Sequence, residues 1–468
     1  MRGAGGAVLP ALIERVTRDH PRIPTVPSCV SYSARLSARP EFASGVVDAV
    51  TGGAALGDHD RARAAAVGEA VERYCANAVP AELPLAAHRR LTREGRPAVD
   101  PRAFALYSPA QYAHRGFPFT PMTPDLELAW VPGTDLGDGE EVLVPASLAY
   151  VNYLRGPHAA EPPTHYPLLA GTAAGAGIAQ ARRAALEEVL ERDAVTLWWL
   201  SGAPAAALAP APGGPAAAAA GEARAAGLRV TFLRIPSTFE VIVAGVFLED
   251  PARRLVAFGS ACRATAEEAA AKALTEAVGM HETGLELLDH DGDFWSGVRA
   301  GRFGHRPYRP YRGDRTYRDA FRSDLRDVND VRLHLQLHLD PRTQDARLDR
   351  LRAPAAASVP ARGPAPGGGP APGDAPAPGG GPDAYLPRLT AQLAAQGLRA
   401  LTVDLTTPEA RDAGLHVVRV LVPGLSCNAP AAFPFLGGRR LYEEPVARGW
   451  VPGPLTEDAL LLDPLPFS

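Results

Sequence analysis

The sequence predicts an α+β protein in which long helices and short strands are mixed. Three segments carry an apolar stripe at helical spacing, and four short runs are rich in Val, Leu, Ile and Phe. The predicted helices span residues 60–77, 178–200 and 265–289, and the predicted strands span 228–235, 241–249, 254–262 and 416–422. This mixture favours packed sheets with helices against them over a doubly wound parallel sheet.

Capping residues indicate where two of these helices begin. Asp58 precedes the first helix and Thr265 precedes the third. Both side chains carry an oxygen that can accept a hydrogen bond from an unpaired backbone N–H of the first helical turn. Three of the predicted strands follow one another and lead directly into the third helix, so strand and helix are expected to be close neighbours.

The composition argues against a nucleic-acid-binding protein. The chain has 468 residues and a formal net charge of −4, whereas a dedicated nucleic-acid-binding protein is normally basic. Four widely spaced cysteines form no CxxC pair, which predicts reduced thiols in a cytoplasmic protein and no zinc site. They are Cys29, Cys75, Cys262 and Cys427. No apolar run approaches the roughly 18 residues that cross a bilayer, so no membrane partner is expected.

Two segments of low complexity divide the chain. Residues 202–221 are mostly Ala and Pro, and residues 354–382 are almost entirely Pro, Gly and Ala. Both are therefore expected to be loops or linkers that bury no core. We predict a short, turn-rich lead-in over 1–45, a main body over 46–353, the second segment as a linker, and a C-terminal part over 383–468.

The most informative feature is a near-repeat within the three predicted helices, each of which has an apolar pair, one spacer and a glutamate. Positions i, i+3 and i+4 share one helix face. Each helix therefore presents charged neighbours beside its apolar stripe: Glu69, Glu72 and Arg73; Glu188, Glu191 and Arg192; Lys272 and Glu276. A buried carboxylate is costly unless it is paired or binds a cation. Converging helices would form an oxygen-rich site suited to Mg²⁺.

Two other interpretations of these charged groups stay open at this point. A single ExxER sequence is commonly an exposed ion pair on a helix surface, although its repetition in the same apolar context argues against that reading. A carboxylate di-iron site is the second alternative, but it would use Glu-x-x-His pairs, which these helices lack.

A glycine-rich stretch, residues 171–177 with the sequence GTAAGAG, precedes the second helix. A glycine-rich loop before a helix offers backbone N–H groups to a phosphate. The stretch lacks the GK[ST] of a P-loop, so its significance comes from its position beside the glutamate helix.

Together these segments resemble the YcaO superfamily. The family's three signatures resemble residues 65–74, 171–199 and 259–277, and its closing region resembles residues 416–425 and 436–445. The resemblance implies a YcaO-type α+β fold with mixed or antiparallel sheets. It also implies a cleft that binds ATP and Mg²⁺ and is lined by the glutamate-bearing helices.

The resemblance implies a role for each matching residue. The magnesium ligands or their supports would be Glu69, Glu72, Glu188 and Glu191. The nucleotide contacts would be Arg73, Gly175, Gln180, Arg192, Lys272 and Glu276, and the terminal carboxylate of Ser468 would be the catalytic base. The sequence departs from the family pattern at Ala65, Ala176, Gln180, Gly279 and His281, which leaves a non-catalytic member open.

The end of the chain indicates the subgroup, because azoline-forming members end in a proline-rich tail that Pro464 and Pro466 resemble in shortened form. The implied activity is ATP-dependent cyclodehydration of Cys, Ser or Thr in a ribosomally made precursor peptide. Two alternatives stay open: a YcaO enzyme that makes a thioamide or amidine, and a degenerate scaffold. Prolines favour an extended path, so we expect the tail to reach the active site.

The resemblance also implies partner proteins. About 45 residues before the motif-bearing region are too few for a leader-binding domain, so a separate leader-peptide-binding partner is expected. A flavin dehydrogenase in the same complex and a second copy of the chain, forming a homodimer, are further partners that stay open. Arginines and tyrosines alternate over residues 299–326, which is typical of a solvated or subunit-contact surface, or of a docking site for an acidic leader peptide.

Overall fold

A computed structural model of the chain describes residues 12–21, 23–37, 49–302, 307–344, 346–355 and 384–467. The described strands form three antiparallel sheets. The first contains β1 (Ile13–Arg18), β2 (Cys29–Leu36) and β3 (Val50–Leu56). The second, in the order β11-β10-β9-β8, contains Leu255–Arg263, Ile242–Asp250, Arg229–Ile235 and Ala206–Ala207. The third, in the order β4-β5-β12-β13-β7 with β6 on β5, contains Leu85–Ala87, Glu127–Asp135, Leu401–Asp404, His416–Leu421, Thr172–Gly175 and Glu141–Pro145.

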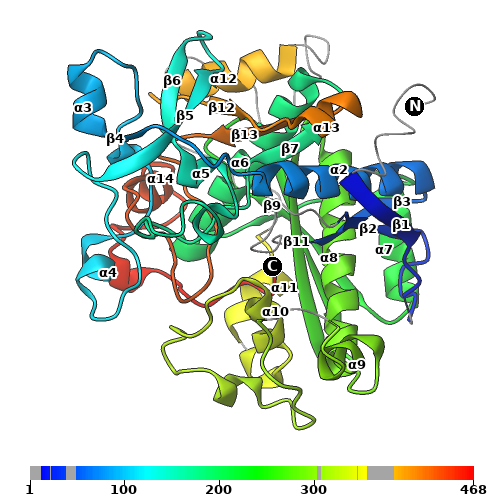
Figure 1. Cartoon of the computed structure of the whole chain (residues 1–468). Helices are drawn as coiled ribbons and strands as arrows, with labels where there is room; N and C mark the ends of the chain where they lie inside the picture. Colours follow the sequence, from blue (N-terminus) through cyan, green and yellow to red (C-terminus); the bar gives the residue numbers. More distant parts are fainter. Residues whose placement is uncertain are drawn as a thin grey trace.

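Helices cover these sheets (Figure 1). They are α2 (His59–Asn77), α3 (His88–Arg93), α4 (Pro109–Ala113), α5 (Ala146–Ala149), α6 (Ile178–Ser201), α7 (Pro215–Ala225), α8 (Ala266–Leu288), α9 (Asp293–Arg299), α10 (Arg332–His338), α11 (Asp349–Arg352), α12 (Tyr385–Ala395), α13 (Pro408–Asp412) and α14 (Arg440–Ala447). None of the helices in the described ranges combines the length and apolar character needed to cross a membrane.

The predicted fold class is confirmed, and each predicted helix and strand forms close to its expected bounds. Asp58 accepts a hydrogen bond from the Arg61 backbone N–H at 2.9 Å, and Thr265 accepts one from Glu268 at 3.3 Å. The predicted caps of α2 and α8 are therefore present.

Helix α6 lies at the centre of the molecule and packs on two sheets. Its Leu186 and Leu190 belong to the same buried cluster as Val420 of β13 and Phe258 of β11. Helix α2 packs on β3 and β2, and α8 packs on β11 and β10. Because α6 touches both larger sheets, its position fixes how the charged faces of the three predicted helices are arranged.

Three strand glycines allow these helices to approach their strands closely. A Cβ atom would lie 2.0 Å from the backbone of α2 if it were added to Gly53, 2.7 Å from α6 at Gly175, and 2.4 Å from α8 at Gly259. No side chain fits at such distances, so only glycine permits the contact. The near-repeat of the sequence is thus a repeated strand–helix unit: β3–α2, β7–α6 and β11–α8.

The expectation that residues 202–221 bury no core is wrong. Pro215 begins helix α7, and Ala216, Ala219, Ala220 and Ala223 are buried at helical spacing against the same core as α8. Alanine is the best helix former, and the alanines of this run that follow Pro215 form a helix that packs against the same core as α8.

The glycine-rich stretch and the lead-in also differ from expectation. Thr172–Gly175 is strand β7, which pairs with β13, so only the residues from Gly175 to Gly177 form a turn. Within residues 1–45, β1 and β2 form a sheet with β3 where a turn-rich segment was expected. Residues 356–383, most of the predicted linker, lie outside the described residues. The predicted division into domains therefore stays a prediction.

The contact of Gly259 with α8 yields a stability prediction. Gly259→Ala is expected to lower the free energy of unfolding by about 1–3 kcal/mol, because the methyl group overpacks a backbone contact. The matched control is Gly279→Ala within α8, where an added Cβ meets nothing within 4 Å. That control is expected to be neutral or stabilising by about 0.5–1 kcal/mol. Urea unfolding measures both; equal stabilities would contradict the packing argument.

Candidate active site

The charged faces of α2, α6 and α8 meet beside the turn that precedes α6. On α2, Glu72 accepts a hydrogen bond from the Ala174 backbone N–H of β7 at 2.8 Å. On α6, Glu188 accepts one from the Gly171 backbone N–H, also at 2.8 Å. The ammonium of Lys272 on α8 interacts electrostatically with Glu69 of α2. The structure therefore brings together the glutamates that the sequence places on three separate helices.

Two of these carboxylates lack full electrostatic compensation. Burial raises the pKa of Glu72, and the nearby Glu69 and Glu188 carboxylates raise it further. Burial also raises the pKa of Glu188, with only partial relief from Arg192. Yet the side chains of Glu69 and Glu188 keep 35% and 32% of their surface exposed. Glu188 is therefore both accessible and incompletely compensated, and an added cation would stabilise it together with its neighbour Glu72.

Glu191 has a different environment, since its side chain is only 6% exposed. One carboxylate oxygen accepts from Ser260 Oγ at 2.7 Å, and the other accepts from the Cys262 backbone N–H at 3.1 Å. Both donors belong to β11, so Glu191 ties α6 to the neighbouring sheet. Of the two roles that the resemblance implies, this environment favours the support of a metal ligand.

The predicted cations lie among these carboxylates. Arg73 pairs with Glu69 at 2.5 Å, and Lys272 pairs with Glu276. Arg192 lies 3.9 Å from Glu188 and 3.6 Å from Glu191. Its Nη1 atom is buried and makes no hydrogen bond within the described residues. A buried donor of this kind suits an additional anionic acceptor such as a phosphate oxygen.

The turn before α6 holds the two remaining predicted nucleotide contacts. Gly175 packs against the first turn of α6, and the Gln180 side chain accepts a hydrogen bond from the Ala176 backbone N–H at 3.1 Å. The N-cap residue, Gly177, has no side chain to cap the helix. The N–H groups of this helix end can therefore donate to an anion.

The donor set of this cluster fits Mg²⁺ only in combination with other ligands. In the described part of the chain, no group of three His, Cys, Asp or Glu side chains is arranged to hold a metal ion by itself. Mg²⁺ does not require such a group, because it is usually held by one or two carboxylates together with water and substrate phosphates. The incompletely compensated Glu72 and Glu188, which lie beside a helix end that suits an anion, fit that mode of binding.

One of the departures from the family pattern, His281, points away from these carboxylates. His281 is completely buried, and its Nε2 lies 3.3 Å from Asp250 of β10, so its side chain packs against the sheet. Gly279 follows Glu276 by one turn of α8 and has open space around it.

The C-terminal tail, residues 463–467, ends beside this cluster. Leu465 and Phe467 are buried in the same core as α6, and the guanidinium carbon of Arg192 lies 4.6 Å from the centre of the Phe467 ring. In Figure 1 the end of the chain accordingly lies in the middle of the molecule. Ser468 lies outside the described residues, so its assignment as the base stays a prediction.

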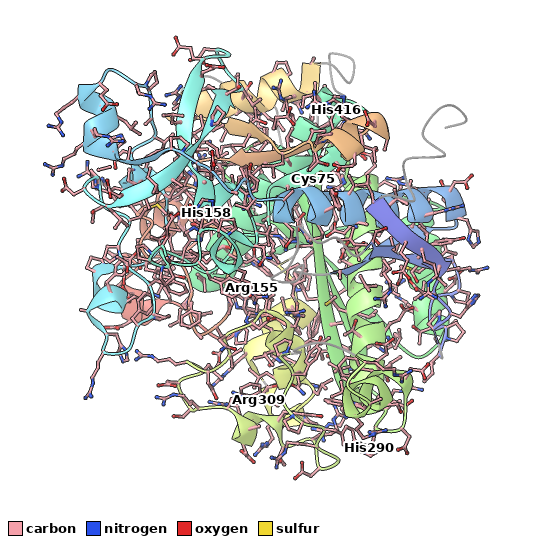
Figure 2. All side chains as sticks on the ribbon, in the orientation of Figure 1. Cys75, Arg155, His158, His290, Arg309 and His416 are labelled. Carbon is pink, nitrogen blue, oxygen red and sulfur yellow. The ribbon has the colours of Figure 1, made fainter. Side chains whose placement is uncertain are left out.

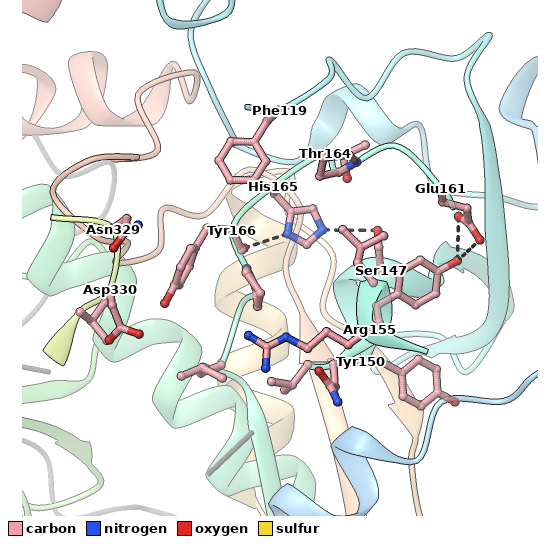
Figure 3. Close-up of a pocket in the computed structure, with 18 of the residues that line it drawn as sticks. Phe119, Ser147, Tyr150, Arg155, Glu161, Thr164, His165, Tyr166, Asn329 and Asp330 are labelled. Carbon is pink, nitrogen blue, oxygen red and sulfur yellow. Dashed lines mark hydrogen bonds between the residues drawn. The ribbon is translucent and has the colours of Figure 1, made fainter. Parts of the chain in front are cut away.

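A cavity of about 1200 Å³ adjoins the cluster and shares Arg73 with it. One wall comes from residues 147–169 and the other from residues 307–332. Figure 2 locates Arg155 near the centre of the molecule and Arg309 below it, and both line this cavity. Figure 3 shows the Arg155 side chain reaching inward, with Asp330 on the opposite wall. The cavity is lined by aromatic, proline and arginine side chains.

Most of these cavity residues could not be predicted from the sequence, because they lie on irregular segments without a periodic pattern. His165 is one of them. Its Nδ1–H donates to the Tyr166 carbonyl at 2.9 Å, and its Nε2 lies 3.3 Å from Ser147 Oγ. Burial lowers the pKa of His165 to about 4, so the ring is neutral at neutral pH.

Arg419 is a residue that sequence reasoning overlooked although a signal existed. It is an arginine within the apolar strand β13, and it is completely buried. Its guanidinium donates to the carbonyls of Leu168 and Leu169 at 2.7 and 3.0 Å. Arg419 thereby positions the segment that leads into β7, at the edge of the carboxylate cluster.

The arginine-rich segment 299–326 is largely engaged within the chain. Arg315 donates to three backbone carbonyls and Arg318 to two, while Arg309 pairs with Asp327 at 2.9 Å. These contacts hold the loop together, which leaves less free charge than the sequence suggests. Docking of an acidic leader peptide at this segment stays a prediction.

Comparison with protein families gives the class of protein that this fold and site define. Residues 54–426, well over half of the chain, match the family described as YcaO cyclodehydratase, ATP- and Mg²⁺-binding. The chain belongs to this family. No curated protein gives a significant match to the sequence.

Solved structures show the same fold. A heterocyclase in complex with substrate and cofactor is 21% identical with a TM-score of 0.65, and 97% of this chain covers 55% of it. The heterocyclase TruD is 19% identical with a TM-score of 0.55, and 87% of this chain covers 50% of it. YcaO from Methanopyrus kandleri, bound with AMPPCP and Mg²⁺, is 19% identical with a TM-score of 0.52, with coverages of 89% and 86%. The chain thus spans about half the length of the two heterocyclases.

Because the pKa of Glu188 is raised, Glu188→Gln is predicted to change protein stability and ligand affinity in opposite directions. The ionised Glu188 carboxylate destabilises the metal-free fold above that pKa, and this destabilisation disappears as the pH falls through the pKa. Glu188→Gln should therefore leave the metal-free protein at least as stable as the wild type near neutral pH, with the difference shrinking in acid. Thermal unfolding across pH measures this effect.

The same substitution should weaken Mg²⁺-dependent ATP binding by about tenfold or more, because a carboxylate is lost where a cation is stabilised. Calorimetry with ATP and Mg²⁺ measures the affinity. Glu82→Gln removes an exposed carboxylate outside the three helices and serves as the control. An affinity equal to that of the wild type would remove Glu188 from the metal site.

Proposed function

We propose that the chain is an ATP- and Mg²⁺-dependent cyclodehydratase that converts Cys, Ser or Thr of a ribosomally made precursor peptide to azolines. The strongest support is that the charged faces of α2, α6 and α8 lie together and that the C-terminal tail contacts Arg192 beside them. Family membership supports the cofactors, and the heterocyclases with the same fold support the reaction class.

The environment of each residue indicates its proposed role. Glu69, Glu72 and Glu188 would hold Mg²⁺, because Glu69 and Glu188 are accessible and Glu72 and Glu188 lack full compensation. Glu191 keeps α6 in place on β11. Arg73 and Arg192 would bind phosphate oxygens, as would the N–H groups between Gly175 and Gln180. Lys272 and Glu276 form an ion pair that would contact the nucleotide. Ser468 is the proposed base.

The chemistry requires positioning and charge neutralisation more than covalent participation by the protein. The side chain of the substrate's Cys, Ser or Thr adds to the preceding backbone carbonyl. ATP held by Arg73, Arg192 and the N–H groups between Gly175 and Gln180 would supply the phosphoryl group that turns the amide oxygen into a leaving group, and Mg²⁺ held by Glu69, Glu72 and Glu188 would neutralise charge. Departure of phosphate and loss of a proton complete the ring. The net change is one water removed from the peptide for each ATP converted to ADP and phosphate.

The cavity beside Arg73 supports a peptide as the substrate. Its volume of about 1200 Å³ exceeds the need of a single small molecule, and its aromatic and proline lining suits an extended chain. The Arg155 side chain points into the cavity, where it could contact backbone carbonyls or acidic side chains of a peptide. A bound peptide would thus reach the carboxylate cluster at the end of the cavity that Arg73 shares.

The deciding experiment supplies the purified full chain with ATP, Mg²⁺ and a precursor peptide that carries its leader. We predict peptide-dependent ADP release and a mass loss of one water per ring. ATP turnover with another mass change, such as exchange of an amide oxygen for sulfur, would favour the thioamide alternative. Absence of ATP binding would favour the scaffold alternative and overturn the proposal.

A separate leader-peptide-binding protein is proposed as a partner, and a flavin dehydrogenase and a homodimer remain proposals for the same complex. The Escherichia coli microcin synthetase McbBCD complex with pro-MccB17 bound, 10% identical with a TM-score of 0.52, shares the fold. We predict weak ring formation by the chain alone and strong stimulation by the leader-binding partner. A kinetic titration of partner against chain measures this. Full activity without any partner at low peptide concentration would contradict the prediction.

A further inference from the structure

The C-terminal tail is bonded to the rest of the protein through its carbonyl oxygens. Prolines lack a backbone N–H, so Pro464 and Pro466 can take part only as acceptors. Trp199 Nε1 donates to the Asp463 carbonyl at 2.6 Å, and the Phe258 backbone N–H of β11 donates to the Pro466 carbonyl at 2.9 Å. The body of the protein must therefore supply a donor at each place where the tail is fixed.

His338, the last residue of α10, supplies the donor for Pro464. Its Nε2 lies 2.8 Å from the Pro464 carbonyl oxygen, and its side chain is almost fully buried. A carbonyl oxygen can only accept, so Nε2 carries the proton. Thr343 Oγ1 lies 3.1 Å from Nδ1 and orients the ring from its other side.

His334 lies one helical turn earlier and contacts the tail at its end. Its Nε2 accepts the Ala431 backbone N–H at 3.0 Å, and a second hydrogen bond joins the ring to the Phe467 backbone. Burial lowers the pKa of His334 to about 3, so the ring is neutral. His334 thus connects Phe467, which stacks on Arg192, with the segment that follows β13.

We propose that His334 and His338 are positioning residues that hold the C-terminal tail against the carboxylate cluster. They act through the tail: by fixing Pro464 and Phe467 they keep the Phe467 ring on Arg192 and direct the chain end toward the cluster. Their effect on ring formation rests on the proposed function. Their anchoring of the tail does not, and it can be measured without any substrate.

The first experiment measures release of the tail by carboxypeptidase from the folded full-length chain. His338→Leu is expected to speed the release of Phe467 about fivefold, the effect of losing one buried hydrogen bond on local opening. His338→Gln, which retains an N–H donor, should restore slow release. The matched control is Gln336→Leu on the same helix, because Gln336 is completely buried but bonds to the Arg309 backbone instead of the tail. Equal release from the His338→Leu and Gln336→Leu variants would overturn the anchoring.

The second experiment measures ring formation in the intact chain, and ATP affinity both in the intact chain and in a chain that lacks Pro464 to Ser468. His334→Gln and His338→Leu should lower kcat in the intact chain, while the affinity for ATP stays within about twofold of the parent chain in both backgrounds. A purely structural role would weaken ATP binding in both backgrounds and would overturn the positioning role. If the wild-type chain forms no rings, the proposed function fails, while carboxypeptidase release still decides the anchoring.

Discussion

The close contact between a strand glycine and the helix that follows it is the constraint on which the site depends. It occurs at Gly53 with α2, at Gly175 with α6 and at Gly259 with α8. In each unit, the absence of a side chain brings the helix backbone against the strand. Three glutamate-bearing helices are thereby fixed to strands of three different sheets, and α6, which packs on two of those sheets, sets their common orientation. A larger residue in any unit would displace the carboxylates of that helix.

The electrostatics of the cluster follow from this packing. Glutamates that could be exposed ion pairs on an isolated helix become neighbours of one another, and burial raises the pKa values of Glu72 and Glu188. The protein contains enough basic groups to offset part of this cost, through Arg73, Arg192 and Lys272. A bound cation and an anionic ligand would offset the remaining imbalance. Such an arrangement suits phosphoryl transfer, in which catalysis consists of positioning and charge neutralisation.

Two arginines connect the carboxylate cluster to the tail and to the cavity. Arg192 is shared by the carboxylates and Phe467, while Arg73 is shared by the carboxylates and the cavity. Helix α10 contributes to both the cavity and the tail contacts, since Arg332 at its start lines the cavity and His338 at its end holds Pro464. One short helix therefore contributes both to the cavity wall and to the anchoring of the tail.

The sequence by itself determined the elements and their charged faces. Helical periodicity and the caps Asp58 and Thr265 located α2 and α8 to within a residue, because these signals are local. The same local reasoning failed at residues 202–221, where composition indicated a linker, since the helical state of α7 depends on a partner surface for its alanines. Arg419, an arginine within an apolar strand, was a local signal of a buried polar contact that went unused.

Only the tertiary structure decided which residues meet. The pairing of Glu191 with Ser260 and Cys262, the cavity formed by residues 147–169 and 307–332, and the contact of His334 and His338 with the tail join segments far apart in the chain. No periodicity encodes such contacts, because they depend on how separate elements pack. The sequence thus determined which groups each helix offers, and packing around the strand glycines decided that they form one site.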